Sequence, residues 1–358
     1  MERAPDLLAL GLDDRVRALT AGRGRNGELG RVIRSDRGFA FVVTESGLRV
    51  ARPATRLVKQ ADEGGLPVVG DWVVVSGDED DEPLVEDVLE RLSAIMRRDP
   101  GRASRVQVLA ANIDTVVITH PIDSPAKLGR IERELALVWD SGALPVIALT
   151  KADLADDVDA EVLAVGEIAP GVAVHPTSTV SGQGLDEIRA HLGAGRTLVL
   201  IGPSGSGKST LVNALAGEDI QTTREVRMSD GKGRHTTVAR ELITLPTGGA
   251  IIDTPGLRAV GMWDSSEGLD QAFADIAGLA EGCRFRDCTH DGEPGCAVEA
   301  AVVSGELPER RLESYRELQA EIRHVNEELD VRARQERKQA DKRLARDIRR
   351  FYRSGGRS

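Results

Sequence analysis

The sequence predicts a multidomain protein with an N-terminal β-barrel, a central α/β domain and a C-terminal helical domain. Three observations lead to this prediction. Short strand-like segments separated by turn residues fill residues 31–95, which is typical of a small antiparallel barrel such as the OB-fold. Continuous β-branched runs alternate with helical patterns over residues 96–265, which indicates a parallel sheet covered on both sides. Residues 266–358 are mainly helical in pattern and contain all three cysteines.

Length and composition agree with several ordinary globular domains. The chain has 358 residues, of which 41% are hydrophobic and 29% charged, and this composition excludes collagen-like, disordered and disulfide-dense chains. No apolar stretch approaches the ~18 residues of a membrane helix, and the N-terminus does not resemble a secretory signal. We therefore expect a cytoplasmic protein that does not contact membranes. Nothing in the sequence demands more than a monomer.

Residues 1–30 are predicted to be a flexible lead-in, with a short helix within Leu7 to Leu19. The strand candidates that follow are Gly38 to Val43, Leu48 to Arg52, Asp71 to Val75 and Leu84 to Val88. Phe39, Phe41 and Trp72 could stack nucleic-acid bases on the barrel. Alternatively they fill its core, which the low aromatic content of 3% favours.

The motif with the most specific chemistry is G-P-S-G-S-G-K-S-T at residues 202–210, which fits the phosphate-binding pattern G-x-x-x-x-G-K-S/T. It follows a strand candidate, Thr197 to Ile201, and precedes a helix pattern. Its backbone amides and the helix N-terminus supply partial positive charge to phosphates. Lys208 can reach the β- and γ-phosphates, and Ser209 can bind Mg²⁺. The predicted phosphate-binding residues are Gly202, Pro203, Ser204, Gly205, Ser206, Gly207, Lys208, Ser209 and Thr210.

Two further motifs follow other strand candidates. D-T-P-G at residues 253–256 places Asp253 where a carboxylate approaches Mg²⁺ through water, and the amide of Gly256 near the γ-phosphate. T-K-A-D at residues 150–153 is similar to the guanine-reading motif N-K-x-D, in which the Asp carboxylate accepts two hydrogen bonds that adenine cannot donate. A second base-contacting loop is expected after the strand near Val172 to Val174. The predicted base-binding residues are Thr150, Lys151, Ala152, Asp153, Thr177 and Ser178.

The order of these motifs is unusual. Ordinary GTPases have the phosphate loop first, then D-x-x-G, then N-K-x-D. Here T-K-A-D and the base loop precede the phosphate loop, and D-T-P-G comes last. A circular permutation, which keeps the sheet and moves the termini, explains this order. A P-loop ATPase or nucleotide kinase is the alternative, and the two flanking motifs argue against it.

G-K-G-R-H-T-T at residues 231–237 lies between the phosphate loop and D-T-P-G, where a mobile switch is expected. Leu257 stands where Ras-type enzymes have a glutamine that orients the attacking water, and leucine cannot form that hydrogen bond. Our hypothesis is that His235 positions the water when the switch becomes ordered. The alternative is that His235 contacts RNA or packs locally. The candidate Mg²⁺ ligands are Ser209, Thr236, Thr237 and Asp253.

The cysteines and one histidine have the spacing C-x4-C-x-H-x5-C. An odd number of clustered cysteines argues against a disulfide framework. Three thiolates and one imidazole make a closed set of four ligands that suits one structural Zn²⁺, and free thiols are the alternative. The four predicted ligands are Cys283, Cys288, His290 and Cys296.

The C-terminal part has a long helical pattern that begins near Pro308. Its apolar face, which we expect to pack on the body of the protein, consists of Leu312, Tyr315, Leu318, Ile322, Val325 and Leu329. Residues 331–358 contain eleven Lys and Arg and three acidic residues, a local charge of +8 in a chain of net charge −11. A basic tail on an acidic body suggests contact with RNA, and a solvated helix face is the alternative.

In combination, these motifs resemble the ribosome small subunit-dependent GTPases of bacteria, a circularly permuted family. The resemblance rests on the segment Gln107 to Asp114, the four nucleotide and switch motifs and the cysteine signature, which ends E-P-G-C-A-V. It implies an OB-fold, a permuted GTPase and a zinc-binding helical domain, bound to the rRNA of the small ribosomal subunit. It also implies hydrolysis of GTP to GDP that the particle stimulates. The chain departs from the family in its acidic N-terminal half and at Thr150, Pro203 and Ser206.

Two other functions are alternatives for the same residues. The first is a GTP-dependent placement factor, whose function is to bind rRNA and in which GTP hydrolysis only triggers release. In that case, removal of the chain from Arg332 onward should impair rRNA binding far more than basal GTP turnover. A DNA-binding zinc protein fits poorly, because the cysteine cluster lacks the spacing of a recognition helix and the body is acidic.

Overall fold

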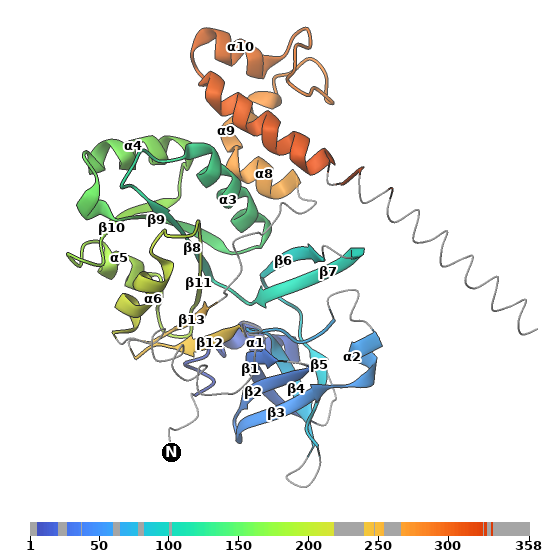
Figure 1. Ribbon diagram of the computed structural model, residues 1–358. Helices are drawn as coiled ribbons and strands as arrows, with labels where there is room; N and C mark the ends of the chain where they lie inside the picture. Colours follow the sequence, from blue (N-terminus) through green and yellow to red (C-terminus); the bar gives the residue numbers. More distant parts are fainter. Residues whose placement is uncertain are drawn as a thin grey trace, which may run out of the picture.

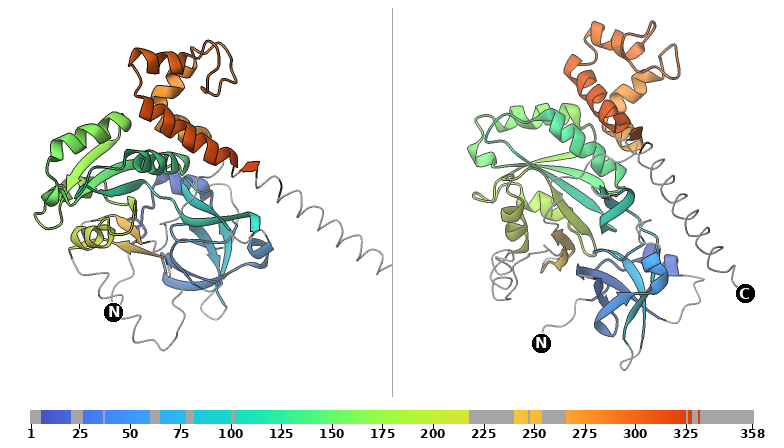
Figure 2. Two further views of the ribbon diagram at one scale, coloured as in Figure 1. Left: turned by 45° about the horizontal axis from the view of Figure 1, so that its top comes forward. Right: turned by 45° about the vertical axis from the view of Figure 1, so that its right-hand side comes forward.

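The computed structural model describes residues 6–20, 27–36, 38–59, 65–77, 82–99, 102–217, 240–246, 248–253, 266–324, 326–327 and 331 (Figure 1). A β-barrel, an α/β domain and a C-terminal helical region follow one another along the chain. Figure 1 and the right-hand view of Figure 2 place the barrel at the bottom of the molecule and the C-terminal helices at its top. Within the described ranges, the helices are all too short or too polar to cross a bilayer.

Within the described residues the barrel has five strands, of which four match the strand candidates from the sequence and the first, β1, was not among them. They are β1 (Glu28–Asp36), β2 (Phe39–Thr44), β3 (Gly47–Pro53), β4 (Trp72–Ser76) and β5 (Leu84–Val88). Strand β1 pairs with both β2 and β4, and β3 pairs with β5, so the sheet closes on itself. The helix α2 (Thr55–Lys59) lies between β3 and β4. Small aliphatic side chains fill the interior: Val32, Ala40, Val42, Ala51, Leu57, Val73, Val75 and Val85.

The aromatic residues of the barrel separate into two groups. Trp72 is 2% exposed and belongs to the core that joins the barrel to the α/β domain, with the Arg31 guanidinium 5.2 Å from its ring centre. Phe39 and Phe41 are half-buried and are absent from the barrel interior. The core interpretation is therefore right for Trp72 and wrong for the two phenylalanines.

The α/β domain has the strand order β10-β9-β8-β11-β13-β12, and only β12 is antiparallel to its neighbour. The strands are β8 (Thr115–Pro121), β9 (Leu144–Thr150), β10 (Ala173–Thr177), β11 (Thr197–Ile201), β12 (Glu241–Thr244) and β13 (Ala250–Asp253). Alternate residues of the central strands enter separate hydrophobic clusters on the two faces. Helices α3 (Leu128–Asp140) and α4 (Val158–Ile168) cover one face, and α5 (Leu185–Ala190) and α6 (Lys208–Ala216) cover the other. This is the doubly covered parallel sheet that the β-branched runs predict.

The prediction of a flexible lead-in over residues 1–30 does not hold for residues 6–20. Leu10 is fully buried, and a turn and the helix α1 (Asp14–Thr20) pack where the barrel meets the α/β domain. Gly11 has a φ of +92°, and a Cβ at this residue would lie 2.4 Å from the carbonyl oxygen of Gly195. The lead-in is therefore part of the core, and its close approach to Gly195 depends on glycine.

Two connections between the barrel and the α/β domain were not predicted. A hairpin of β6 (Ala94–Asp99) and β7 (Arg102–Ala111) links β5 to β8. In addition, β1 pairs with β12 at Arg34 and Glu241, so the barrel strands and the parallel strands form one continuous 11-stranded sheet. The barrel thus contacts the strand that directly follows the predicted switch.

The C-terminal region contains α8 (Ser266–Ala272), α9 (Ala274–Ala280), α10 (Ala297–Ser304) and a helix over residues 309–324. The last helix begins directly after Pro308, as predicted. Leu312, Tyr315 and Leu318 are buried against Phe273 and α3, which confirms that this apolar face packs on the body. Val325, Leu329 and the basic segment from Arg332 lie outside the described residues.

Candidate functional site

The predicted nucleotide motifs lie together at the carboxyl edge of the parallel sheet. Strand β9 ends at Thr150, β10 at Thr177, β11 at Ile201 and β13 at Asp253. Because these strands are parallel neighbours in the order given above, T-K-A-D, the base loop, the phosphate loop and D-T-P-G all begin at the same edge. The permuted chain order therefore gives a single composite site.

The phosphate loop packs closely against β8 at its start. A Cβ at Gly202 would lie 2.3 Å from the carbonyl oxygen of Thr119, so no other residue fits there without displacing the backbone. Helix α6 begins at Lys208, directly after the loop. Ser204, Ser209 and Thr210 are exposed, so the loop and the first turn of α6 are open to a ligand. This geometry presents amides and a helix N-terminus to an incoming anion.

The Lys208 ammonium group folds back over the loop. Its Nζ donates to the carbonyl oxygens of Gly202 at 2.8 Å and Pro203 at 2.6 Å, and to the hydroxyl of Ser206 at 3.3 Å. The charge therefore lies directly above the loop backbone, where the phosphates of a nucleotide are expected.

The T-K-A-D motif is fixed by its neighbours. The Thr150 hydroxyl donates to the Ser206 carbonyl oxygen at 2.8 Å, and Lys151 pairs with Asp123. Lys151 has a φ of 60°, and Asp153 lies in an exposed 3-10 turn, η2 (Ala152–Leu154). The Lys stem and the Asp carboxylate are thus both accessible to a base.

The second base loop lies beside this motif. Thr177 pairs with Thr150 in the β9–β10 register. The Ser178 hydroxyl accepts hydrogen bonds from the amides of Val180 and Ser181, both at 3.2 Å. The loop is therefore a closed turn, and Thr177 and Ser178 are both buried.

Part of the predicted site lies outside the described residues. These are Gly256 of D-T-P-G, Leu257, and the switch residues His235, Thr236 and Thr237. Of the four candidate Mg²⁺ ligands, the structure places Ser209 at the first turn of α6 and Asp253 at the end of β13. A hydroxyl and a carboxylate are oxygen donors that suit Mg²⁺.

Three residues near the site were not predicted. Thr119, at the end of β8, bonds to the phosphate loop through its hydroxyl. His120 and Glu134 are buried, and one polar atom of each, Nδ1 and Oε2, has no hydrogen-bond partner among the described residues. Burial raises the pKa of Glu134, and hydrogen bonding from Arg130 opposes this. Nothing local distinguishes these residues from ordinary strand and helix residues, so only the fold reveals them.

His120 makes stability depend on pH. Burial, and then Arg130 and Lys127, lower its pKa from 6.5 to about 4. Between these values the unfolded chain binds a proton that the folded chain does not, so folding stability falls as pH drops through this range. Between pH 7 and pH 5 the wild type should lose about 2 kcal/mol more than His120→Gln in urea unfolding. Equal losses in the two proteins would show that His120 is not responsible.

The four predicted metal ligands come together in the C-terminal region. Their donor atoms all lie within 4.8 Å of one another, with His290 Nδ1 3.4 Å from Cys296 Sγ and 3.6 Å from Cys283 Sγ. Sulfur atoms of a tetrahedral zinc site lie ~3.8 Å apart, so the spacing fits one ion. Amides at the start of α10 donate to Cys283 and Cys296, which favours their thiolates. The group could therefore hold one metal ion.

A buried ionic cluster attaches the metal-binding region to α3. Glu132 is fully buried and accepts two hydrogen bonds from Arg310, both at 3.0 Å, one from Arg311 at 2.7 Å and one from Ser314 at 2.6 Å. Burial alone raises the pKa of Glu132, but these hydrogen bonds outweigh it and hold the pKa below its ordinary value. The cluster joins the helix beside the nucleotide motifs to the C-terminal helices.

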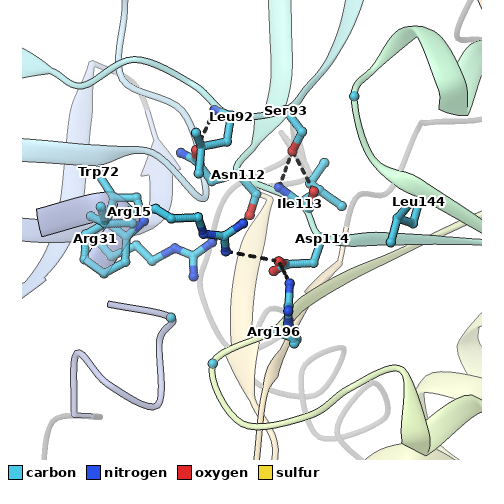
Figure 3. A pocket seen from close by; sticks show the side chains of 14 residues that line it. Arg15, Arg31, Trp72, Leu92, Ser93, Asn112, Ile113, Asp114, Leu144 and Arg196 are labelled. Atoms are coloured by element: carbon cyan, nitrogen blue, oxygen red, sulfur yellow. Dashed lines mark hydrogen bonds and ion pairs between the residues drawn. The ribbon is translucent and has the colours of Figure 1, made fainter. Parts of the chain in front are cut away.

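A cavity of about 190 Å³ lies at the opposite edge of the sheet (Figure 3). Arg196 pairs with Asp114 at 2.6 Å, and Arg15 approaches the same carboxylate at 3.9 Å. Arg31 is buried nearby and bonds to Leu10, Gly70, Asn112 and Thr197. Burial lowers its pKa to about 10, so it remains charged at neutral pH. This cavity is where the lead-in, the barrel and the α/β domain meet, and it is separate from the nucleotide motifs.

The fold and the site together define a circularly permuted P-loop GTPase with an OB-like barrel and a Cys3His group. A sequence model described as RsgA GTPase matches residues 88–263. The "small ribosomal subunit biogenesis GTPase RsgA" of Streptomyces coelicolor is 49% identical over 86% of this chain and 84% of its own length. A relative from Lactiplantibacillus plantarum, named RsgA 2, is 44% identical over 88% of this chain and 89% of its own length. The chain belongs to the RsgA GTPase family.

Solved structures agree with this assignment. YjeQ from Thermotoga maritima is 26% identical, with a TM-score of 0.63 over 83% of this chain and 99% of that one. YloQ, described as a circularly permuted GTPase, is 29% identical, with a TM-score of 0.60 over 85% of this chain and 97% of that one. A permuted order of the motifs thus agrees with the description of YloQ.

Proposed function

We propose that this protein hydrolyses GTP and assists the late maturation of the small ribosomal subunit, which stimulates its turnover. The observation that carries the proposal is the composite site, in which the T-K-A-D motif and the phosphate loop are bonded at one sheet edge. The names of the relatives support the link to the small subunit. On this proposal, residues 96–265 bind GTP or GDP, and residues 31–95 and 266–358 contact rRNA. The protein acts in the cytoplasm as a monomer.

The outer face of the barrel supports the contact with RNA. Arg52 lies over the Phe39 ring at 4.9 Å, and Arg34 lies over the Phe41 ring at 5.0 Å. Val50 is 44% exposed beside them. Rings flanked by guanidinium groups suit stacking of unpaired bases and attraction of phosphates. This surface adjoins β12 through the pairing of Arg34 with Glu241.

Hydrolysis follows from positioning and charge. Asp153 and Lys151 orient the base, and Lys208 and the loop amides neutralise the phosphates, so that the γ-phosphate faces the attacking water. Ser209 and Asp253 would hold Mg²⁺ with Thr236 and Thr237, and the ion would neutralise the β- and γ-phosphate oxygens. His235 positions the water. The metal ion in the Cys3His group is proposed to be one structural Zn²⁺, because its four protein ligands leave no open position.

The test is phosphate release from GTP and from ATP, with and without purified small subunits. We expect slow release from GTP, strong acceleration by subunits and no release from ATP. Equal use of ATP, or indifference to subunits, would contradict the proposal. In the same assay, His235→Ala should lose the acceleration, and full acceleration would exclude His235 as the water-positioning residue.

A further inference from the structure

An ion pair joins the base motif to the loop that follows β8. The Lys151 ammonium lies 2.5 Å from Oδ2 of Asp123, a residue 28 positions away in the chain. The two side chains are 36% and 35% exposed, so the pair lies at the surface of the site and not in the core. The pattern of the base motif gives no reason to expect this pair, because it involves only residues 150–153.

The loop that carries Asp123 is held at both ends. The amide of Ile122 donates to the carbonyl oxygen of Thr150 at 2.9 Å, which extends the pairing of β8 with β9 by one residue. At the other end of the loop, the amide of Lys127 donates to Nε2 of His120 at 3.0 Å. Asp123 therefore has a fixed place beside the end of β9, and it can hold a flexible side chain there.

The order of the strands places this loop between the two ends of a bound nucleotide. Strand β8 lies between β9, which ends in the base motif, and β11, which ends in the phosphate loop. A nucleotide with its base at Asp153 and its phosphates at Lys208 therefore passes over the carboxyl end of β8. The Lys151 side chain leans from β9 toward β8, because Asp123 holds its ammonium. Its apolar stem then lies where it can cover one face of the base.

The base motif offers Lys151 one other carboxylate, that of Asp153. Asp153 is two residues away, is exposed and has no ion-pair partner among the described residues. An ion pair between Lys151 and Asp153 would occupy the carboxylate that is expected to accept hydrogen bonds from guanine. The pairing of Lys151 with Asp123 therefore leaves Asp153 available to the base.

We propose that Asp123 is a positioning residue for binding of the guanine base and that it acts through Lys151. The inference rests on the proposed function and deepens it. The ion pair orders the long Lys151 side chain before the nucleotide arrives, so less conformational freedom is lost on binding. It also directs the ammonium away from the Asp153 carboxylate. Both effects favour the base and leave the phosphates untouched.

The test is a double-mutant cycle on the affinity for GDP, measured by competition with a fluorescent guanine nucleotide on the full chain with Mg²⁺. Asp123→Asn keeps the shape of the side chain and removes its charge, and we expect it to weaken GDP binding about fivefold. Lys151→Met keeps an apolar stem without the ammonium. In that background Asp123→Asn should cause no further loss. Asp123→Glu keeps the charge and should stay within about twofold of the wild type.

Inorganic pyrophosphate separates an effect on the base from an effect on the phosphates. It can occupy the phosphate loop and has no base, so its affinity should be equal in the wild type and in Asp123→Asn. Ser124→Ala is the matched control, because Ser124 is exposed in the same loop, directly after Asp123. It should leave the affinities for GDP and for pyrophosphate unchanged.

The inference and the proposed function fail in different ways. Wild-type affinity for GDP in Asp123→Asn would overturn the inference. A loss that is equally large in the Lys151→Met background would overturn it too, because Asp123 would then not act through Lys151. A loss that pyrophosphate shares would show a general structural role instead. If the wild type binds no guanine nucleotide, or binds ADP equally well, the proposed function itself fails.

Discussion

Lys208→Ala is expected to lower the rate of GTP hydrolysis by about 10²-fold or more, both with and without small subunits. Lys208 is the charged group of the phosphate loop, and its ammonium lies directly over the loop carbonyls of Gly202 and Pro203. Its removal takes a positive charge from the place where negative charge accumulates during phosphoryl transfer. The affinity for GDP should fall too, because the β-phosphate loses the same partner.

The measurement is phosphate release at saturating GTP, with nucleotide affinity determined separately. Lys59→Ala is a matched control, since Lys59 is exposed at the end of α2 in the barrel and far along the chain from the motifs. It should retain the wild-type rate without subunits. Basal turnover in Lys208→Ala equal to that of the wild type would place the hydrolytic site elsewhere.

Loss of the metal should unfold the region around α10. The segment between Cys283 and Cys296 has little regular structure of its own, and a metal ion bound by the four side chains would take the place of a hydrophobic core. Structural zinc contributes ~10–16 kcal/mol in small domains, which exceeds the stability of most domains. We expect Cys296→Ser, or treatment with a strong chelator, to make residues 283–304 sensitive to protease. Metal content should fall from one ion per chain to none.

Asp287→Asn is the control for this experiment. Asp287 is exposed in the same loop and is outside the Cys3His group, so its variant should keep the metal and resist protease. Protease resistance of Cys296→Ser equal to that of the wild type would argue for free thiols. Nucleotide binding should survive in Cys296→Ser, because the base and phosphate motifs lie in a different domain.

Features that depend on residues close together in the sequence could be predicted from it. The phosphate loop is recognisable because its glycines and Lys208 must follow one strand and open one helix. The barrel strands follow from alternation and turns, and the cysteine group follows from spacing. The sequence of β7 also alternates between apolar and polar residues around Val106 to Val108, which is typical of a strand. The hairpin that β7 forms with β6 was nevertheless not predicted.

Features that depend on partners far away in the sequence could not be predicted from it. Glu132 is an acidic residue in the middle of a helix, and only Arg310 and Arg311, almost half the chain away, show why it is buried. The leucines near the N-terminus look like a short helix, yet their burial depends on the shape of the junction around Arg31 and Gly195. Sequence patterns identify an apolar face and do not specify the surface that it covers.

The permuted order of the strands also decides how the sheet is assembled while the chain is being translated. Of the parallel strands, β8, β9 and β10 are made first and can pair side by side, but the edge of β8 that faces β11 has no partner until β11 has been made. An unpaired edge rich in Val and Ile invites association with other chains. About twenty residues, from 178 to 196, separate β10 from β11, and α5 lies within them. Until β11 has been made, the nascent chain therefore has an unpaired strand edge at β8. Overproduction should favour aggregates that form through the β8, β9 and β10 part of the sheet.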